Sequence, residues 1–122
     1  MAMEITPNKL SEAISGHDAR NAALRRLLIE KKVNLIEPRL IECHFWTWSE
    51  EDAIDLGRTL ESRGFTVLVR RSAARPDDPD LWNLEAAVTQ SAEVASSHEF
   101  TEQLVRVADF HHGRYDGWGT TI

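Results

Sequence analysis

The spacing of apolar residues changes along the chain, and these changes predict alternating helices and strands. Leucines recur at helical spacing after Asp18 and predict a helix that this residue caps and that ends near Lys32. Residues 1–17 are weakly patterned, and Pro7 and Gly16 are expected to break any helix there. We therefore expect a flexible or loosely docked arm over residues 1–17.

A strand is predicted over about residues 40–48, where the run RLIECHFWTW is aromatic and β-branched. Side chains alternate between the two faces of a strand. Large apolar groups fall on both faces, which is typical of a central strand covered on both sides. One face carries Ile41, Cys43, Phe45 and Thr47, and the other carries His44, Trp46 and Trp48.

The segment SEEDAIDLGRTLESRG carries the signals of a helix with both ends marked. Ser49 is a suitable N-cap, with Asp52 three residues later, which is close to a capping box. Gly64 allows the left-handed conformation that ends a helix. The expected buried stripe consists of Ala53, Leu56, Gly57 and Leu60.

Two more strands, another helix and a closing strand complete the pattern. FTVLVRR and LWNLEAAVTQ predict strands on either side of the proline-containing loop SAARPDDPD. Ser96 and Glu99 form a capping box for a helix that Gly113 ends, and a short strand follows over about residues 114–118. The expected inward-facing side chains are Phe65, Val67 and Val69 in the first strand and Trp82, Leu84, Ala86 and Val88 in the second.

The predicted order is therefore a helix followed by β-α-β-β-α-β. This is the split βαβ arrangement of an α+β, ferredoxin-like sandwich, in which an antiparallel four-stranded sheet carries two helices on one face. The extra N-terminal helix needs a place to dock, and the second face of the sheet is one candidate. We expect a single domain over residues 18–122, after the arm over residues 1–17.

Composition and charge narrow the classes of function. The 122 residues suit one domain, no apolar run approaches the roughly 20 residues of a membrane span, and the N-terminus lacks the pattern of a secretory signal. The single cysteine fits a reducing compartment, so we expect a cytoplasmic protein. The formal charge of −6 argues against tight binding to DNA or other bare phosphate backbones and suits a partner with a basic surface.

The tail HHGRYDGWGTTI gathers residues that often carry chemistry, but their spacing favours a structural role. His111 and His112 are adjacent on a helix, so their side chains point about 100° apart and do not easily share a metal ion. The Asp-Gly pair is typical of a turn or a bulge, and Tyr115 or Trp118 is expected to fill the edge of the core.

No catalytic, metal-binding or cofactor-binding set is predicted elsewhere. The chain contains no GxSxG motif, no glycine-rich phosphate loop and no Cys/His/Asx arrangement. Cys43 lies on the face expected to be buried, which favours a small hydrophobe over a nucleophile. A solvated turn explains the three carboxylates of RPDDPD better than a calcium site does. We expect neither an enzyme nor a cofactor.

The aromatic face of HFWTW permits two interpretations. RNA-recognition modules of this topology stack bases on aromatic side chains of the open sheet face, and His44, Trp46 and Trp48 are candidates for such a platform. Alternatively, the N-terminal helix or neighbouring strands cover these side chains. The acidic net charge and the absence of a Gly-aromatic signature on the third strand favour the second interpretation.

Three segments within residues 18–118 resemble the RraB-like family, whose members are regulators that inhibit ribonuclease E. The segments are LLIEKKVNLIEPRLIECHFW, SEEDAIDLGRTLESRGFTV and GRYDGW. The resemblance implies a ferredoxin-like α/β sandwich and a protein-binding regulator without catalytic residues. HFWTW departs from the usual H-H-F-x-F of the family because it is richer in tryptophan.

The resemblance and the acidic charge together predict a protein that docks onto an RNA-degrading enzyme, ribonuclease E in the first instance. Acidic side chains are the candidate contacts because they steer association toward a basic segment, although helix-start and turn chemistry is the simpler explanation for each. The alternatives are a single-stranded RNA-binding module and a family member with another protein partner. The candidate contacts are Glu50, Glu51, Asp52, Asp77, Asp78 and Asp80.

Overall fold

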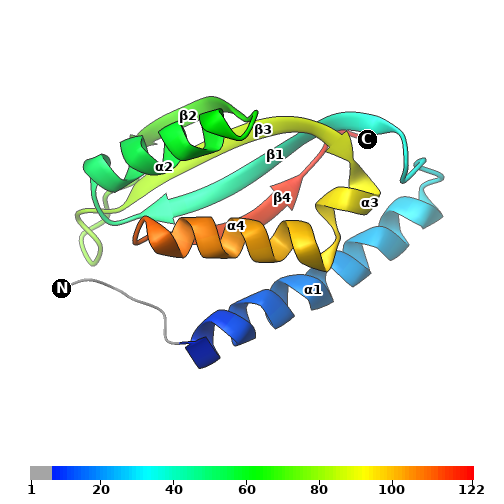
Figure 1. Ribbon diagram of the computed structural model, residues 1–122, viewed down its shortest axis with the longest axis horizontal. Helices are drawn as coiled ribbons and strands as arrows, with labels where there is room; N and C mark the ends of the chain where they lie inside the picture. The colour runs from blue at the N-terminus through cyan, green and yellow to red at the C-terminus, as the bar shows by residue number, and fades with distance from the viewer. Residues whose placement is uncertain (1–6) are drawn as a thin grey trace.

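Four strands form one sheet in the order β2-β3-β1-β4, and every neighbouring pair is antiparallel. The computed structural model describes residues 7–122 (Figure 1). The fold is α+β and ferredoxin-like with an additional N-terminal helix, as the hydrophobic pattern predicts. The elements are α1 Pro7–Glu30, β1 Pro38–Thr47, α2 Glu50–Ser62, β2 Thr66–Ser72, β3 Trp82–Ser91, α3 Ala92–Ala95, α4 His98–Phe110 and β4 Arg114–Gly119.

The core lies between one face of the sheet and the helices α2 and α4. Helix α2 packs on β2 and β3, and α4 packs on β4 (Figure 1). On β1, the predicted inward face is fully buried, with Ile41, Cys43 and Phe45 each 0% exposed. Phe45 pairs with Leu84 on β3, and Cys43 pairs with Ala86, so the two central strands contribute to one apolar layer. All four residues of the predicted α2 stripe are buried.

The ends of α2 follow the sequence signals, whereas the start of α4 does not. The hydroxyl oxygen of Ser49 accepts a hydrogen bond from the backbone N–H of Asp52 at 3.1 Å, and Gly64 has a φ of +93°. The N-cap of α4 is Ser97 rather than the predicted Ser96. Ser96 instead ends the short helix α3, which the pattern did not predict and which Ser91 caps. Either Ser96 or Ser97 can cap a helix. Because Ser96 belongs to the end of α3, α4 uses Ser97.

The N-terminal prediction is wrong for residues 7–17, because they belong to α1. Gly16 lies inside this helix with open space around it and does not interrupt it. Ile14 and His17 are buried, so packing against the domain stabilises a segment whose own helical propensity is weak. Asp18 is therefore no N-cap, and its carboxylate contacts His98 on α4 at 2.8 Å. The rest of the predicted arm, residues 1–6, lies outside the described residues.

Helix α1 docks beside α4 along the β4 edge, and not on the second face of the sheet (Figure 1). Asn21 connects three elements, since its side-chain amide donates to Thr101 of α4 at 2.9 Å and accepts from the indole of Trp118 at 3.0 Å. All three long helices thus lie along the same side or edge of the sheet. The prediction that β1 is covered on both faces is wrong in this respect, since no helix of residues 7–122 crosses the second face.

Two bulges change which side chains face the core. In β4, the bulge lets Tyr115 pair with Phe45 and Trp118 with Cys43, so both aromatic residues face the helices although simple alternation places them on opposite faces. Gly117 supplies the positive φ of +113° that this bulge needs, as the Asp-Gly signal indicated. In β2, the bulge pairs Val69 with Glu85, so Val69 is not inward-facing as predicted.

The turn after α4 places its two special residues differently from the prediction. His112, not Gly113, adopts the left-handed conformation that ends the helix, with a φ of +58°. Gly113 is needed for a different reason. A Cβ atom at this position would lie 2.7 Å from the carbonyl oxygen of Trp46, so only glycine allows β4 to approach β1 this closely.

Candidate protein-docking surfaces

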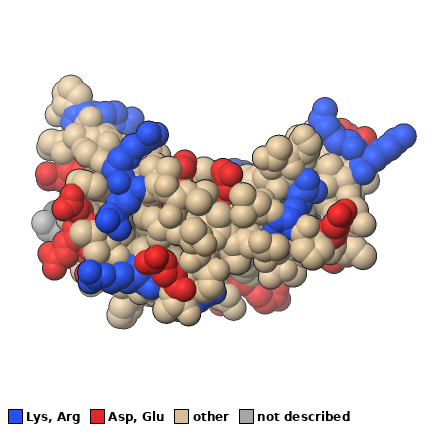
Figure 2. Space-filling view, turned by 90° about the horizontal axis from the view of Figure 1, so that it is seen from above, with Lys and Arg blue, Asp and Glu red and all other residues tan. Residues whose placement is uncertain are grey.

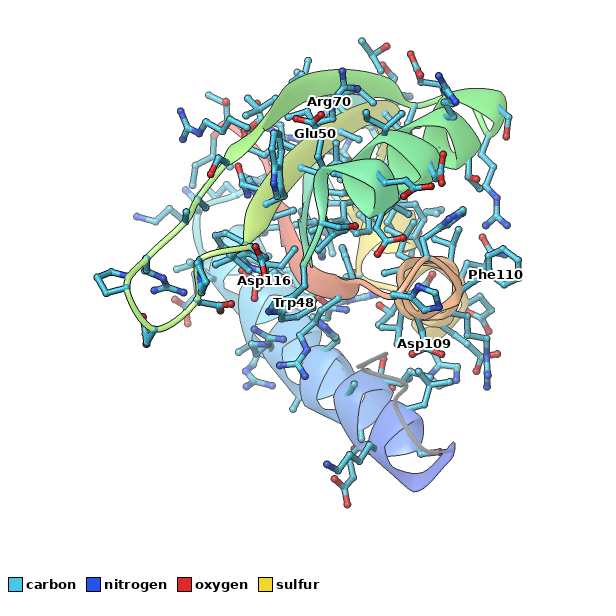
Figure 3. All side chains as sticks on the ribbon, turned by 90° about the vertical axis from the view of Figure 1, so that its left-hand side faces the viewer. Trp48, Glu50, Arg70, Asp109, Phe110 and Asp116 are labelled. Atoms are coloured by element: carbon cyan, nitrogen blue, oxygen red, sulfur yellow. The ribbon has the colours of Figure 1, made fainter. Side chains whose placement is uncertain are left out.

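The second face of the sheet is open and hollowed. Its aromatic side chains on and next to β1, His44, Trp46 and Trp48, are neither fully buried nor fully exposed. Figure 2 shows the outline of the molecule hollowed between two projecting ends that both carry Lys and Arg side chains. Figure 3 shows α2 and α4 on one side of the sheet and the β2–β3 loop on the other. The open face is thus a shallow recess with aromatic residues in its floor.

The charged side chains beside His44 in this recess are acidic. The imidazole Nδ1 of His44 lies 3.1 Å from a carboxylate oxygen of Glu85, its cross-strand partner on β3. Glu42 precedes His44 by two positions on β1 and therefore shares this face. Of the three aromatic candidates for base stacking, His44 is engaged by a carboxylate, and the carboxylates of Glu42 and Glu85 near it repel a phosphate backbone. Trp46 instead lies between Asn83 on β3 and Arg114 on β4.

The two predicted acidic segments flank the same end of the sheet. Thr47, the last residue of β1, pairs with Trp82, the first residue of β3. The acidic start of α2 follows Thr47 closely, and the acidic β2–β3 loop directly precedes Trp82, so both segments lie at this end of the sheet, on opposite sides of it (Figure 3). Arg70 and Arg71 reach the same end along β2, because Ser72 also pairs with Trp82. The surface is therefore mixed in sign, not uniformly acidic.

Local structure explains two of the six predicted acidic contacts. Asp52 lies in the first turn of α2, where its backbone N–H bonds the Ser49 cap and its carboxylate lies 3.7 Å from His112. Asp78 closes the tight turn of the loop through two backbone hydrogen bonds with Arg75. The other four side chains are exposed and form no ion pair within residues 7–122. They are Glu50, Glu51, Asp77 and Asp80.

The histidines and the cysteine lie in structural positions. Within residues 7–122, no group of three or more His, Cys, Asp or Glu residues is arranged to hold a metal ion. His111 contacts the Thr59 hydroxyl at 2.9 Å, and its partial burial lowers its pKa. Burial raises the pKa of the Cys43 thiol to about 12, so the thiolate is absent at neutral pH. His17 lies against the Tyr115 carbonyl at 3.0 Å, and burial lowers its pKa.

Sequence reasoning missed a groove between α2 and α4. The groove has a volume of about 430 Å³, and an exposed aromatic residue, Phe110, lines it together with Arg63, Arg106 and Val107. Figure 3 shows Phe110 at the last turn of α4, pointing away from the sheet. The available signal was that Phe110 falls outside the buried stripe of its own helix, which marks it as an outward-facing aromatic residue.

Comparison with known protein families identifies a family for this chain. The model of the family RraB, described as regulator of ribonuclease activity B, matches residues 18–120. The match includes every strand of the sheet and the part of α1 that carries Asn21. No curated protein sequence matches the chain. None of the helices within residues 7–122 combines the length and apolar character needed to cross a membrane.

Proposed function

The chain belongs to the RraB family of regulators of ribonuclease activity, and on that premise we propose that it binds ribonuclease E and inhibits or redirects its cleavage of RNA. The protein acts in the cytoplasm by docking, and it makes and breaks no covalent bond. The observation that carries this proposal is the family match over residues 18–120. The exposed carboxylates at one end of the sheet support docking onto a basic segment of the enzyme.

Charge and apolar contact have separate roles in this docking. Exposed ion pairs contribute only about 0.2–1 kcal/mol each, so the carboxylates of Glu50, Glu51, Asp77 and Asp80 mainly steer the encounter. Trp48 lies immediately before the start of α2 and is partly exposed, so an aromatic anchor adjoins the acidic end. Partly buried aromatic residues next to steering charges are typical of energetically important interface positions.

The direct test combines a binding measurement with a cleavage assay. Purified protein is titrated into ribonuclease E from the same host, and cleavage of a labelled RNA is followed. We expect a saturable reduction or a changed cleavage pattern. Failure of the protein to alter cleavage, together with affinity capture from the host that recovers no RNA-degrading enzyme, rejects the proposal. Capture of an unrelated protein would instead identify a family member with another partner.

A matched pair of charge variants tests the acidic surface. Reversal at the acidic end is expected to slow association about tenfold or more at low salt, and less at high salt, because salt screens steering. The control carries the same change in net charge on exposed glutamates elsewhere and should associate nearly normally. The test variant is Glu50→Lys/Glu51→Lys/Asp77→Lys/Asp80→Lys, and the control is Glu12→Lys/Glu30→Lys/Glu37→Lys/Glu61→Lys.

Binding of single-stranded RNA to the open sheet face is the second candidate. The partial exposure of Trp46 and Trp48 favours it, whereas the His44–Glu85 pair in the same recess opposes it. The test is a titration with labelled single-stranded RNA at low salt. No binding at high micromolar protein rejects this candidate. Charge reversal at Asp77 and Asp78 distinguishes the two functions, since it weakens acidic docking but not base stacking.

A further inference from the structure

The groove between α2 and α4 lies on the helix-covered side of the molecule, away from the aromatic recess. Its volume of about 430 Å³ falls within the range of about 300–1,000 Å³ typical of ligand sites. A second hollow of about 290 Å³ continues it, since Arg63 and Gln103 line both. The continuation adds the aromatic residues Phe65 and Phe100 to its walls. Two adjoining hollows that are each lined by aromatic side chains suit a ligand that presents more than one side chain, such as a peptide segment.

An apolar side chain is the natural occupant of the first hollow. Phe110 is 77% exposed, the most exposed large hydrophobic residue in the described part of the chain. Its ring lies edge-on to the imidazole of His111, with 5.1 Å between ring centroids and an interplanar angle of 85°. Val107 contributes a further apolar wall. An exposed aromatic ring beside an apolar wall gains free energy when a partner removes it from water.

A hydrogen bond between α2 and α4 fixes the geometry of the groove in the absence of a bound partner. His111 on α4 and Thr59 on α2 are joined by a hydrogen bond of 2.9 Å between Nε2 and the hydroxyl oxygen. Burial lowers the pKa of His111, so the imidazole is neutral at pH 7. The two helices also share the buried core beneath. A groove fixed in this way does not have to be ordered on binding, which reduces the entropic cost.

The charges at the first hollow are cationic, in contrast to the net charge of the chain. Arg63 and Arg106 line this hollow and no carboxylate does among the described residues, whereas Glu99 lines the continuation. Arg63 forms no ion pair within residues 7–122, and the Nε of Arg106 lies 3.5 Å from a carboxylate oxygen of Glu102 in an exposed pair. Guanidinium groups bind carboxylates through paired hydrogen bonds, so two of them beside an apolar wall fit an acidic ligand.

We propose that the α2–α4 groove binds a short peptide segment in which an aromatic or leucine side chain lies next to one or more carboxylates. The apolar side chain packs against Phe110 and Val107, and the carboxylates pair with Arg63 and Arg106. The site is separate from the acidic end of the sheet, which attracts a basic segment. The proposal therefore does not depend on ribonuclease E, and the protein has two surfaces with opposite charge preference.

Selection from a random-peptide display library on the immobilised full-length protein tests this proposal. We expect enrichment of peptides that combine an aromatic residue or leucine with Asp or Glu, and amide chemical-shift changes at α2 and α4 when an enriched peptide is added. Phe110→Ala should weaken that peptide about tenfold or more, as for an anchor residue. The side chain is exposed, so the variant should keep its fold, which circular dichroism checks.

Charge reversal gives the sharper comparison. Selection on Arg63→Glu/Arg106→Glu should enrich basic peptides in place of acidic ones. Arg26→Glu/Arg58→Glu, at exposed positions of α1 and α2, is the matched control with the same change in net charge and should leave the original preference unchanged. Enrichment without acidic residues, or binding unaffected by Phe110→Ala, overturns the proposal. So does a dimer that Phe110→Ala dissociates, which would make a second copy the occupant, and so does displacement of the peptide by single-stranded RNA.

Discussion

The two faces of β1 carry side chains of similar size but have different environments. Phe45 is 0% exposed beneath the helices, whereas Trp46, the next residue, is partly exposed on the open side. Both are large and aromatic, so residue type alone does not distinguish the core from the surface. The difference shows that alternation assigns residues to faces, whereas the position of the helices determines which face becomes the core.

The largest expected effect comes from truncating the covered face. Phe45→Ala should lower the free energy of unfolding by about 3–5 kcal/mol, because it leaves a cavity where β1, β3 and β4 share the core. Trp46→Ala on the open face should cost about half as much or less, since that side chain already contacts water. Urea unfolding of both variants measures the contrast. Equal losses would show that the open face is as tightly packed as the core.

Next in size is the effect of a methyl group at the contact between β4 and β1. Gly113→Ala should destabilise by about 1–3 kcal/mol, because the new Cβ would lie 2.7 Å from the backbone oxygen of Trp46 and the strands must separate. Gly16→Ala is the control, since that glycine is helical and surrounded by open space. It should stabilise by about 0.5–1 kcal/mol. Thermal unfolding of the two variants should therefore shift in opposite directions.

A smaller effect is expected from removing one oxygen atom from the covered face. The Tyr115 hydroxyl is buried without a hydrogen-bond partner in the described structure, and the nearby Cys43 thiol is a weak hydrogen-bonding group. Tyr115→Phe keeps the ring that packs against Phe45 and removes an unsatisfied group. The stability should stay the same or rise by about 1 kcal/mol. A clear loss in urea unfolding would reveal a partner for the hydroxyl.

The smallest effect concerns pH at the edge of the covered face, where His17 stacks on Tyr115 with 4.9 Å between ring centroids. Burial lowers the pKa of His17 below its ordinary 6.5, so the unfolded chain takes up a proton that folded His17 resists. The free energy of unfolding should therefore fall as the pH falls below about 6.5. His17→Gln should flatten this decline in unfolding curves measured at several pH values.

Two other histidines also contribute to the pH dependence of the free energy of unfolding. His111 has a pKa lowered by burial and acts in the same direction as His17. The pKa of exposed His98 is raised by its hydrogen bond to Asp18, so its stabilising effect is present at low pH and is lost as the pH rises. An unchanged decline in His17→Gln would assign the decline to His111, because His98 acts in the opposite direction.

Much of the fold followed from local patterns that the structure confirms. The α2 helix has its predicted cap at Ser49, its predicted stripe and its predicted stop at Gly64, because each signal acts within a few residues. The start of α1 was missed because Ile14 and His17 gain their burial from contacts distant in sequence. The bulge in β4 was anticipated from Asp-Gly, but its effect of turning Trp118 toward the core required the strand register.

For the sites, the sequence identified residues but not how they combine. It marked the acidic segments and the aromatic strand, and the pairing of Thr47 with Trp82 placed both acidic segments at one end of the sheet. It did not mark the arginine-lined groove, because Arg63 directly follows α2 whereas Arg106 lies on α4, and each looks like an ordinary surface residue.

The sequence by itself determined the order of the strands and of the long helices, both ends of α2 and the two faces of β1, because these depend on interactions between near neighbours along the chain. Only the tertiary structure decided that α1 docks at the β4 edge and leaves the second sheet face open. It also decided that both acidic segments lie at one end of the sheet and that Phe110 remains exposed. These outcomes depend on burying apolar surface between segments far apart in sequence, and no local pattern specifies that choice.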